Sequence, residues 1–235
     1  MTIVIRRANE RGARSLDWLE SKFTFAFGDY YDPRNLGFGA LRALNENSVA
    51  ADRGFDEARL TDLEIISYVC DGALRHRDSL GNDVVVSAGG VQRLSAGRGV
   101  AHRQVNASST EPLRFIQVWI LPNSLDATPS YETIARAPAP PAGGLRLLGS
   151  QTGRQGSLTI DRELDFYLAA LREGETIAHP LGPDREVWFH VLKGAVAIEG
   201  EQLRAGDGAG LQDLEILTIA ADEEAEALVF DMQRG

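Results

Sequence analysis

The chain has 235 residues, enough for one large or two small domains that each bury a core. Its 34 Asp and Glu residues exceed its 24 Lys and Arg residues by ten, and an acidic surface argues against general binding to nucleic acids or anionic membranes. No apolar run reaches the roughly 18 residues that span a bilayer, and Met1–Arg7 lacks the apolar run of a signal peptide. Cys70 is the only cysteine, so no disulfide forms within the chain, and we expect a cytoplasmic protein.

The first fifty residues predict short strands separated by turns. Thr2–Arg6 predicts a strand, whereas Arg11–Ser21 predicts a short helix or a turn. Lys22–Gly28 alternates phenylalanines with smaller residues, which is typical of a strand with one aromatic face. Gly37–Asn45 predicts a further strand, with a short helix as the alternative.

The stretch from Gly54 to Asn106 contains short apolar runs with glycine-bearing turns about every 8–12 residues. The predicted strands here and just beyond are Leu63–Val69, Ala73–His76, Val84–Val86, Val91–Leu94 and Leu113–Leu121. This spacing indicates an antiparallel β sandwich or barrel. Sustained helical periodicity is almost absent from the whole chain, so we expect an all-β fold.

A second pattern follows a proline-rich segment, Asn123–Gly144, which we interpret as a linker that cannot pair regularly in a sheet. Val187–Gly194 resembles Ile65–Gly72, and the order strand, glycine, strand, turn, strand, Ala-Gly, strand then repeats. The remaining predicted strands are Leu145–Leu148, Leu158–Asp161, Phe166–Leu171, Glu215–Ala220 and Ala227–Asp231. Two similar β-barrels from a duplicated unit are therefore expected, over residues 1–135 and 136–235.

Several segments carry a family resemblance. They are FTFAFGDYYDP (Phe23–Pro33), GFGALRALNE (Gly37–Glu46), ALRHRDSLGN (Ala73–Asn82), VQRLSAGRGVAHRQVN (Val91–Asn106), FIQVWILP (Phe115–Pro122), GPDREVWFHVLKG (Gly182–Gly194) and AGDGAGL (Ala205–Leu211). On these motifs the chain resembles the pirins and pirin-like bicupins over nearly its whole length. The resemblance implies two antiparallel, jelly-roll-like cupin β-barrels packed together, with few short helices.

The same resemblance implies a site for iron or another divalent transition metal in the first barrel, held by a His-x-His pair and a His-x-Glu pair. Here those positions fall on Ala58, Leu60, His102 and Gln104. His102 is the only surviving candidate ligand, because methyl and isobutyl groups cannot ligate and a neutral amide is a weak ligand. We therefore expect a degenerate metal site without a cofactor, and a pocket in which His102 and Gln104 are the polar groups.

Other candidate residues have simpler expectations. Cys70 predicts an inert core thiol, or a redox-responsive one if it is exposed at the barrel mouth. His76 predicts a brace for the adjacent hairpin turn. His179 belongs to a faint remnant of a cupin motif in the second half, which we expect to be metal-free and structural.

Three functions remain open from the sequence. The first is a metal-free pirin-like bicupin that binds a small molecule or acts as a regulatory or stress-related protein, with no catalytic residue. The second is a metal-dependent oxidoreductase like quercetin 2,3-dioxygenase, implied by the resemblance, and the third is a protein-binding transcriptional co-regulator. We expect a small-molecule or protein partner, no direct contact with nucleic acid or membrane, and a monomer or weak dimer.

Overall fold

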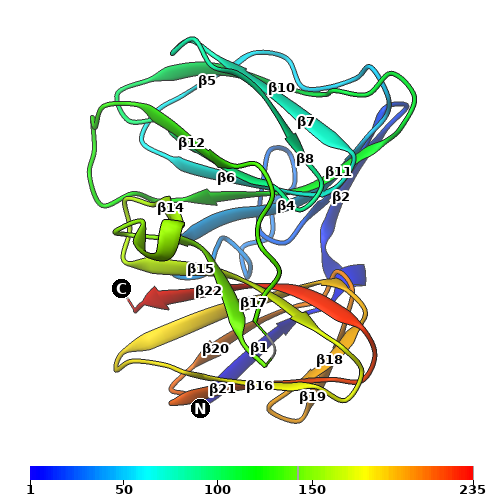
Figure 1. The fold of residues 1–235 in the computed structure, drawn as a ribbon, viewed down its shortest axis with the longest axis vertical. Helices are drawn as coiled ribbons and strands as arrows, with labels where there is room; N and C mark the ends of the chain where they lie inside the picture. Colours follow the sequence, from blue (N-terminus) through cyan, green and yellow to red (C-terminus); the bar gives the residue numbers. More distant parts are fainter. Residues whose placement is uncertain (142, 235) are drawn as a thin grey trace. The chain divides into compact units, whose positions relative to one another are not determined.

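The computed structural model describes residues 1–141 and 143–234, and β-strands dominate them (Figure 1). Contacts divide the chain into two compact units. The N-terminal barrel comprises Gly12–Ala137 and Leu158–Arg162, and the C-terminal barrel comprises Met1–Arg11, Pro138–Ser157 and Glu163–Gly235. Two short 3-10 turns, η1 (Ala8–Glu10) and η2 (Arg154–Gly156), are present. None of the described residues belongs to a helix long and apolar enough for a membrane crossing.

The N-terminal barrel has a larger antiparallel sheet in the order β12-β9-β6-β11-β4-β3-β2 and a smaller one in the order β5-β10-β7-β8. The strands are β2 (Gly12–Leu16), β3 (Leu19–Phe23), β4 (Leu41–Val49), β5 (Ala58–Leu60), β6 (Glu64–Asp71), β7 (Ala73–Asp78), β8 (Asp83–Ser87), β9 (Val91–Ser95), β10 (Val100–Asn106), β11 (Leu113–Ile120) and β12 (Ser130–Ile134). The short β14 (Leu158–Thr159) also belongs to this unit. Apolar side chains such as Leu74 and Phe115 pack between the two sheets.

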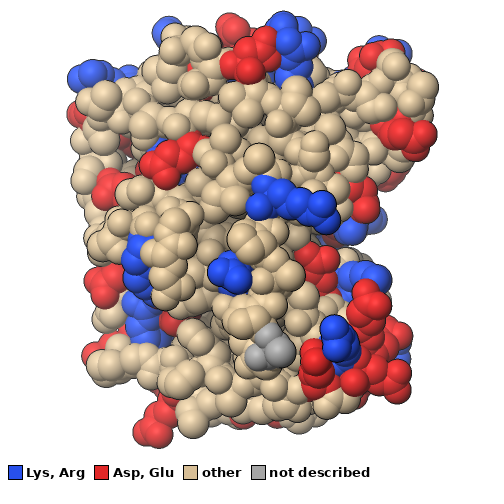
Figure 2. Space-filling view, in the orientation of Figure 1, with Lys and Arg blue, Asp and Glu red and all other residues tan. Residues whose placement is uncertain are grey.

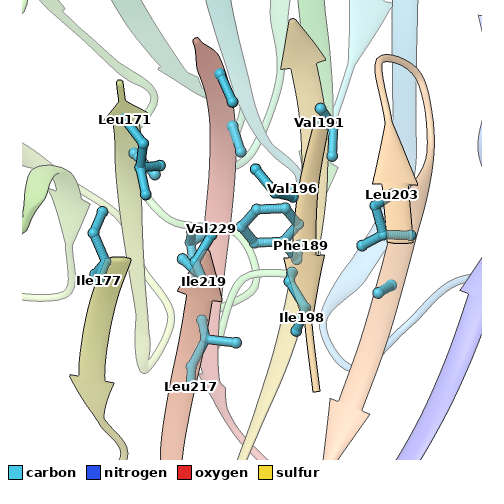
Figure 3. Packing of buried hydrophobic residues seen from close by; sticks show 14 of the residues in the cluster. Leu171, Ile177, Phe189, Val191, Val196, Ile198, Leu203, Leu217, Ile219 and Val229 are labelled. Atoms are coloured by element: carbon cyan, nitrogen blue, oxygen red, sulfur yellow. The ribbon is translucent and has the colours of Figure 1, made fainter. Parts of the chain in front are cut away.

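The C-terminal barrel repeats this plan, with a larger sheet that contains β1-β20-β17-β22-β15-β13 and a smaller sheet β16-β21-β18-β19. The strands are β1 (Thr2–Arg6), β13 (Leu145–Ser150), β15 (Leu164–Leu171), β16 (Thr176–Pro180), β17 (Arg185–Lys193), β18 (Ala195–Ile198), β19 (Glu201–Arg204), β20 (Gly208–Gln212), β21 (Ile216–Ala221) and β22 (Ala225–Gln233). Phe189, Ile219 and Val229 lie in the middle of its core (Figure 3). On the face shown in Figure 2, acidic and basic side chains are interspersed, and acidic ones gather near β18 and β19.

The strand orders confirm the predicted duplication, since β9-β6-β11-β4 corresponds to β20-β17-β22-β15 and β5-β10-β7-β8 corresponds to β16-β21-β18-β19. The matching glycines have the same physical role. Gly72 and Gly194 turn the chain after β6 and β17 with φ of 78° and 76°. A Cβ would lie 2.5 Å from the Pro112 oxygen at Gly72 and 2.2 Å from the Glu224 oxygen at Gly194. Only glycine fits both the backbone angle and the space.

Some predicted elements differ from the structure. Arg11–Ser21 is not a helix, because β2 and β3 form an antiparallel hairpin there. The aromatic strand predicted at Lys22–Gly28 ends at Phe23, beyond which Gly28 has φ of 56° and Phe27 pairs only with Tyr30. The strand predicted at Gly37–Asn45 begins at Leu41 and continues to Val49, which excludes the helical alternative.

The proline-rich segment also differs, since its residues Ser130–Ile134 pair with β9 as β12. This pairing is possible because Pro129 and Pro138 flank β12 and every residue within it keeps its backbone N–H. The units likewise divide the chain differently from 1–135 and 136–235. Met1–Arg11 belong to the C-terminal barrel because β1 pairs with β20.

Candidate functional site: a pocket in the N-terminal barrel

A cavity of about 270 Å³ lies within the N-terminal barrel, between side chains of its two sheets. Its lining residues are Arg14, Leu19, Ser21, Phe23, Phe27, Asn45, Asn47, Phe55, Asp56, Ala58, Leu60, His102, Gln104, Gln117 and Trp119. Most of them come in pairs two residues apart on one strand. Side chains with this spacing point to the same face of a strand, so β4, β5, β10 and β11 each contribute a pair to the interior and β3 contributes three residues.

The four positions predicted from the sequence all line this cavity. Ala58 and Leu60 lie on β5 and His102 and Gln104 on β10, with His102 directly opposite Ala58 in the strand register. The structure therefore brings the predicted set together. Cys70 lies elsewhere, on β6, with a partly exposed side chain that is close enough to raise the pKa of Arg114 electrostatically.

A chain of hydrogen bonds fixes the Gln104 amide. The Trp119 indole donates to Gln117 Oε1 over 3.1 Å, and Gln117 Nε2 donates to Gln104 Oε1 over 2.7 Å. Gln104 Nε2 in turn donates to Ser67 Oγ over 3.1 Å. Because an indole nitrogen can only donate, the direction of the whole chain is set from Trp119. Gln104 thus links the two sheets, and both ends of its amide are engaged.

His102 is a neutral pocket histidine at neutral pH. It is 8% exposed, and burial lowers its pKa from 6.5 to about 4, with the neighbouring His76 adding to the shift. Its Nδ1 has no hydrogen-bond partner among the described residues. It can therefore give or accept one hydrogen bond from a bound molecule.

His76 lies behind His102, with the two ring centroids 5.8 Å apart. Its Nε2 is 2.9 Å from Asp78 Oδ2, and its ring stacks on Tyr131 at 4.5 Å. Asp78 Oδ1 accepts the backbone N–H groups of Leu80 and Asn82. The structure therefore places His76 against the hairpin turn, as predicted, and it also supports the His102 side of the pocket.

Sequence reasoning missed the asparagines of β4. Asn45 is 2% exposed, and its Oδ1 has no partner in the described part of the chain. Asn47 accepts a hydrogen bond from Ser21 Oγ over 2.7 Å. The available signal was the Asn-x-Asn spacing at the end of the strand predicted at Gly37–Asn45, since β4 continues past Asn47 and so places both amides on the interior face.

The donors that line this pocket are fewer than those of an ordinary site for a divalent transition metal. Such a site needs about three or four imidazole, thiolate or carboxylate ligands. The pocket supplies the imidazole of His102 and the carboxylate of Asp56, and the Gln104 amide already makes two hydrogen bonds. Within residues 1–141 and 143–234, no three His, Cys, Asp or Glu side chains are grouped so that they could hold an ion.

Comparison with known proteins identifies close relatives. The family model "Pirin" matches residues 4–120, and "Quercetinase C-terminal cupin domain" matches residues 147–232. The chain is 40% identical over 230 residues to the quercetin 2,3-dioxygenase of Escherichia coli K12, covering 98% of each chain. It is 38% identical over 221 residues to a pirin-like protein of Caulobacter vibrioides, covering 94% of this chain and 95% of that one.

Solved structures agree, and they correct one expectation. The chain superposes on the bacterial pirin YhhW of E. coli in complex with nickel(II) with a TM-score of 0.94 and 39% identity over the full length of both chains. Our expectation that this chain has no cofactor was wrong, because a relative of the same length and fold is a nickel(II) complex and the chain therefore belongs to a metal-binding family. The all-β architecture with cupin barrels, the two family models and the full-length identities together show that this chain belongs to the pirin family.

Proposed function

We propose that the N-terminal barrel binds a small molecule with an apolar body and at least one hydrogen-bond donor. The observation that carries this proposal is a largely apolar cavity that contains two buried polar atoms, Asn45 Oδ1 and His102 Nδ1. Neither atom has a hydrogen-bond partner among the residues that the structure describes. A buried polar group without a partner costs about 1–3 kcal/mol, which a bound ligand or an ordered water recovers. Few polar groups in an apolar cavity are typical of small-molecule sites.

Aromatic side chains favour a planar ligand. The Phe27 and Trp119 rings meet edge to face with centroids 5.0 Å apart, and Phe23 lies 5.6 Å from Phe27. Rings of this kind bind another ring by offset or edge-on contact. Asn45 Oδ1 then selects a ligand with a donor, such as a phenolic hydroxyl, because a carbonyl oxygen only accepts.

A binding assay with a matched pair of ligands tests the proposal. Quercetin appears in the names of several relatives and carries hydroxyl groups that can donate hydrogen bonds. Flavone has the same ring system without hydroxyl groups. We expect quercetin to bind about tenfold more tightly than flavone, as one hydrogen bond in a buried site allows. In Asn45→Leu this preference disappears while flavone binding stays. Equal affinities for both ligands in the wild-type protein would contradict the proposal.

A second candidate is an oxidoreductase that acts on quercetin, favoured by the 40% identity to the E. coli quercetin 2,3-dioxygenase. The test measures the metal content of the purified protein and the oxygen consumed with quercetin, with and without added nickel(II) or iron(II). Metal-dependent consumption that is lost in His102→Ala supports the enzyme. Quercetin binding without oxygen consumption under every condition supports a binding protein alone.

A further inference from the structure

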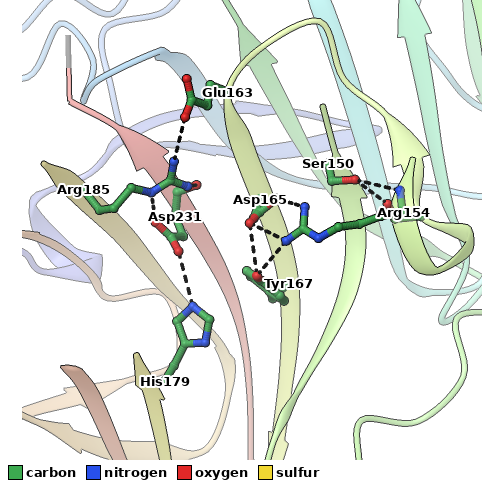
Figure 4. A network of polar contacts seen from close by, with 9 residues as sticks. Ser150, Arg154, Glu163, Asp165, Tyr167, His179, Arg185 and Asp231 are labelled. Atoms are coloured by element: carbon green, nitrogen blue, oxygen red, sulfur yellow. Dashed lines mark hydrogen bonds and ion pairs between the residues drawn. The ribbon is translucent and has the colours of Figure 1, made fainter. Parts of the chain in front are cut away.

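The C-terminal barrel contains a second, chemically different cleft of about 540 Å³. Its walls come from β15, β16, β17 and β22 and from the turn that precedes η2. The side chains that matter here are Arg154, Asp165, Tyr167, His179, Arg185 and Asp231 (Figure 4). Where the N-terminal pocket is mainly apolar, this cleft is built from charged and hydroxyl groups.

The deeper part of the cleft is centred on Asp231, whose side chain is 7% exposed. Arg185 Nε donates to its Oδ1 over 2.7 Å, and Arg185 also donates to the Asp231 backbone oxygen over 2.7 Å. His179 Nε2 lies 3.3 Å from Oδ2. Asp231 therefore holds both neighbours in place, which fixes the second ring nitrogen, His179 Nδ1, as the atom left for a ligand.

The outer part is centred on a second ion pair. Arg154 donates to both oxygens of Asp165, over 2.6 Å each. The Tyr167 hydroxyl donates to Asp165 over 3.2 Å and accepts from Arg154 over 3.4 Å. The Tyr167 ring also meets the His179 ring edge to face at 5.1 Å, which joins the two parts. Arg154 keeps N–H groups for a ligand, since a guanidinium has five and its side chain is 44% exposed.

Donors and acceptors thus alternate along the cleft within a few ångströms of one another. Its charges nearly balance, because the guanidinium groups of Arg154 and Arg185 face the carboxylates of Asp165, Asp231 and Glu163. An anion that enters the cleft is repelled by the carboxylates, and a cation is repelled by the guanidinium groups. The groups of opposite charge that could attract either ion are already paired with each other. A hydroxyl group both donates and accepts, and neighbouring hydroxyls can therefore use an arginine and a carboxylate together.

We propose that this cleft binds a neutral molecule with several adjacent hydroxyl groups, that is, a sugar or cyclic polyol. The ion pairs orient their N–H and oxygen atoms before the ligand arrives, which reduces the entropy lost on binding. The site is separate from the N-terminal pocket in residues and in chemistry. Binding of a sugar in the C-terminal cleft therefore does not depend on whether quercetin binds in the N-terminal pocket.

Nuclear magnetic resonance titration of the full-length, 15N-labelled protein tests the proposal with three sugars of one shape. These are neutral D-galactose, anionic D-galacturonate and cationic D-galactosamine. We expect saturable shifts with D-galactose in residues 151–154, 164–167 and 179–185, and binding about tenfold weaker for both charged sugars. Tyr167→Phe and Arg154→Gln each weaken the binding of D-galactose about tenfold. Each variant removes a hydroxyl or guanidinium group of the charged Arg154–Asp165–Tyr167 cluster, and with it a hydrogen bond of that cluster to the sugar.

Lys193→Gln is the matched control, because it alters an exposed ion pair of the same barrel away from the cleft side chains named above and leaves the affinity unchanged. Tyr167→Phe keeps the ring and Arg154 is partly exposed, so both variants retain the fold, and their unfolding temperatures check this. The proposal is overturned if D-galactose gives no saturable shift at concentrations on the order of 100 mM. It is also overturned if a charged sugar binds as tightly, or if both cleft variants keep the wild-type affinity.

Discussion

At the scale of single residues, burial decides which side chains of the N-terminal barrel respond to pH. His102 and Glu64 are 8% and 1% exposed, and burial disfavours the charged form of each. It lowers the pKa of His102 to about 4 and raises the pKa of Glu64 to about 7. Because one group is a base and the other an acid, their effects on stability run in opposite directions with pH.

Burial of His102 makes the folded protein less stable in acid. The pKa of His102 is 6.5 in the unfolded chain and about 4 in the folded one, so the unfolded state binds more protons between these values. The free energy of unfolding therefore falls as the pH drops from 6.5 to 4, by up to about 3 kcal/mol. In His102→Gln this contribution disappears, so acidification from pH 7 to pH 4 costs the variant less than the wild type. Urea unfolding at both pH values measures the difference, and an equal loss in both proteins contradicts the assignment.

Glu64 gives the opposite slope. Its Oε2 has no hydrogen-bond partner within the described residues and lies 3.7 Å from Arg93 Nε. Its pKa rises from 4.5 to about 7, so the folded state binds more protons and the free energy of unfolding falls as the pH rises through this range. Glu64→Gln removes this pH-dependent loss. Between pH 4.5 and pH 8 the free energy of unfolding of the variant therefore rises by about 3 kcal/mol relative to that of the wild type. Parallel urea titrations of both variants check this, because the slopes must change with opposite sign.

At the scale of elements, the turn glycines explain how one sequence pattern specifies two barrels. Gly72→Ala places a methyl group 2.5 Å from the Pro112 oxygen at φ of 78°, and we expect a loss of about 3 kcal/mol. The control is Gly81→Ala, which has φ of 94° but nothing within 4 Å of the new Cβ, and it should lose only about 1 kcal/mol. Thermal unfolding of both variants measures the gap. A loss at Gly72 no larger than that at Gly81 would show that the neighbouring backbone moves aside.

The elements that the sequence predicted well are the ones with an apolar core face. β6 and β17 are almost wholly buried, and their glycine turns mark where they end. β2 and β12 were missed because they lie at the edge of the sheet in their barrel and have exposed or polar residues at most positions. β1 is also an edge strand, but its residues Ile3–Ile5 are β-branched and made it predictable. An edge strand without such a pattern is defined mainly by its partner's free backbone groups.

The two sites also differ in how far the sequence alone could predict them. Ala58, Leu60, His102 and Gln104 could be predicted because motif spacing carries over directly to strand register. The Asp231 network could not, since it depends on which strands become neighbours. Asp231 meets Arg185 from the adjacent β17 but His179 from the other sheet.

At the scale of the whole molecule, one plan repeated twice carries an apolar pocket in one barrel and a charged cleft in the other. Each site is a set of side chains on an almost unchanged frame. The frame itself can therefore be tested by restoring a ligand set. Register puts residue 58 opposite residue 102, and each pair at 58 and 60 or 102 and 104 lines the same cavity.

The variant Ala58→His, Leu60→His, Gln104→Glu supplies three imidazoles and a carboxylate around that cavity, a set suited to nickel(II). We expect it to bind one nickel(II) per chain at least about 100-fold more tightly than the wild-type chain, as measured by calorimetry, since each added ligand contributes separately to affinity. Adding His102→Ala removes most of the gain, whereas adding His179→Ala in the other barrel leaves it intact. If nickel(II) binds no better than to the wild type, or binds equally well without His102, then the strand register does not place these four positions around one point. The expectation that these four positions correspond to the metal-ligand positions of the pirins would then fail, although the fold would stand.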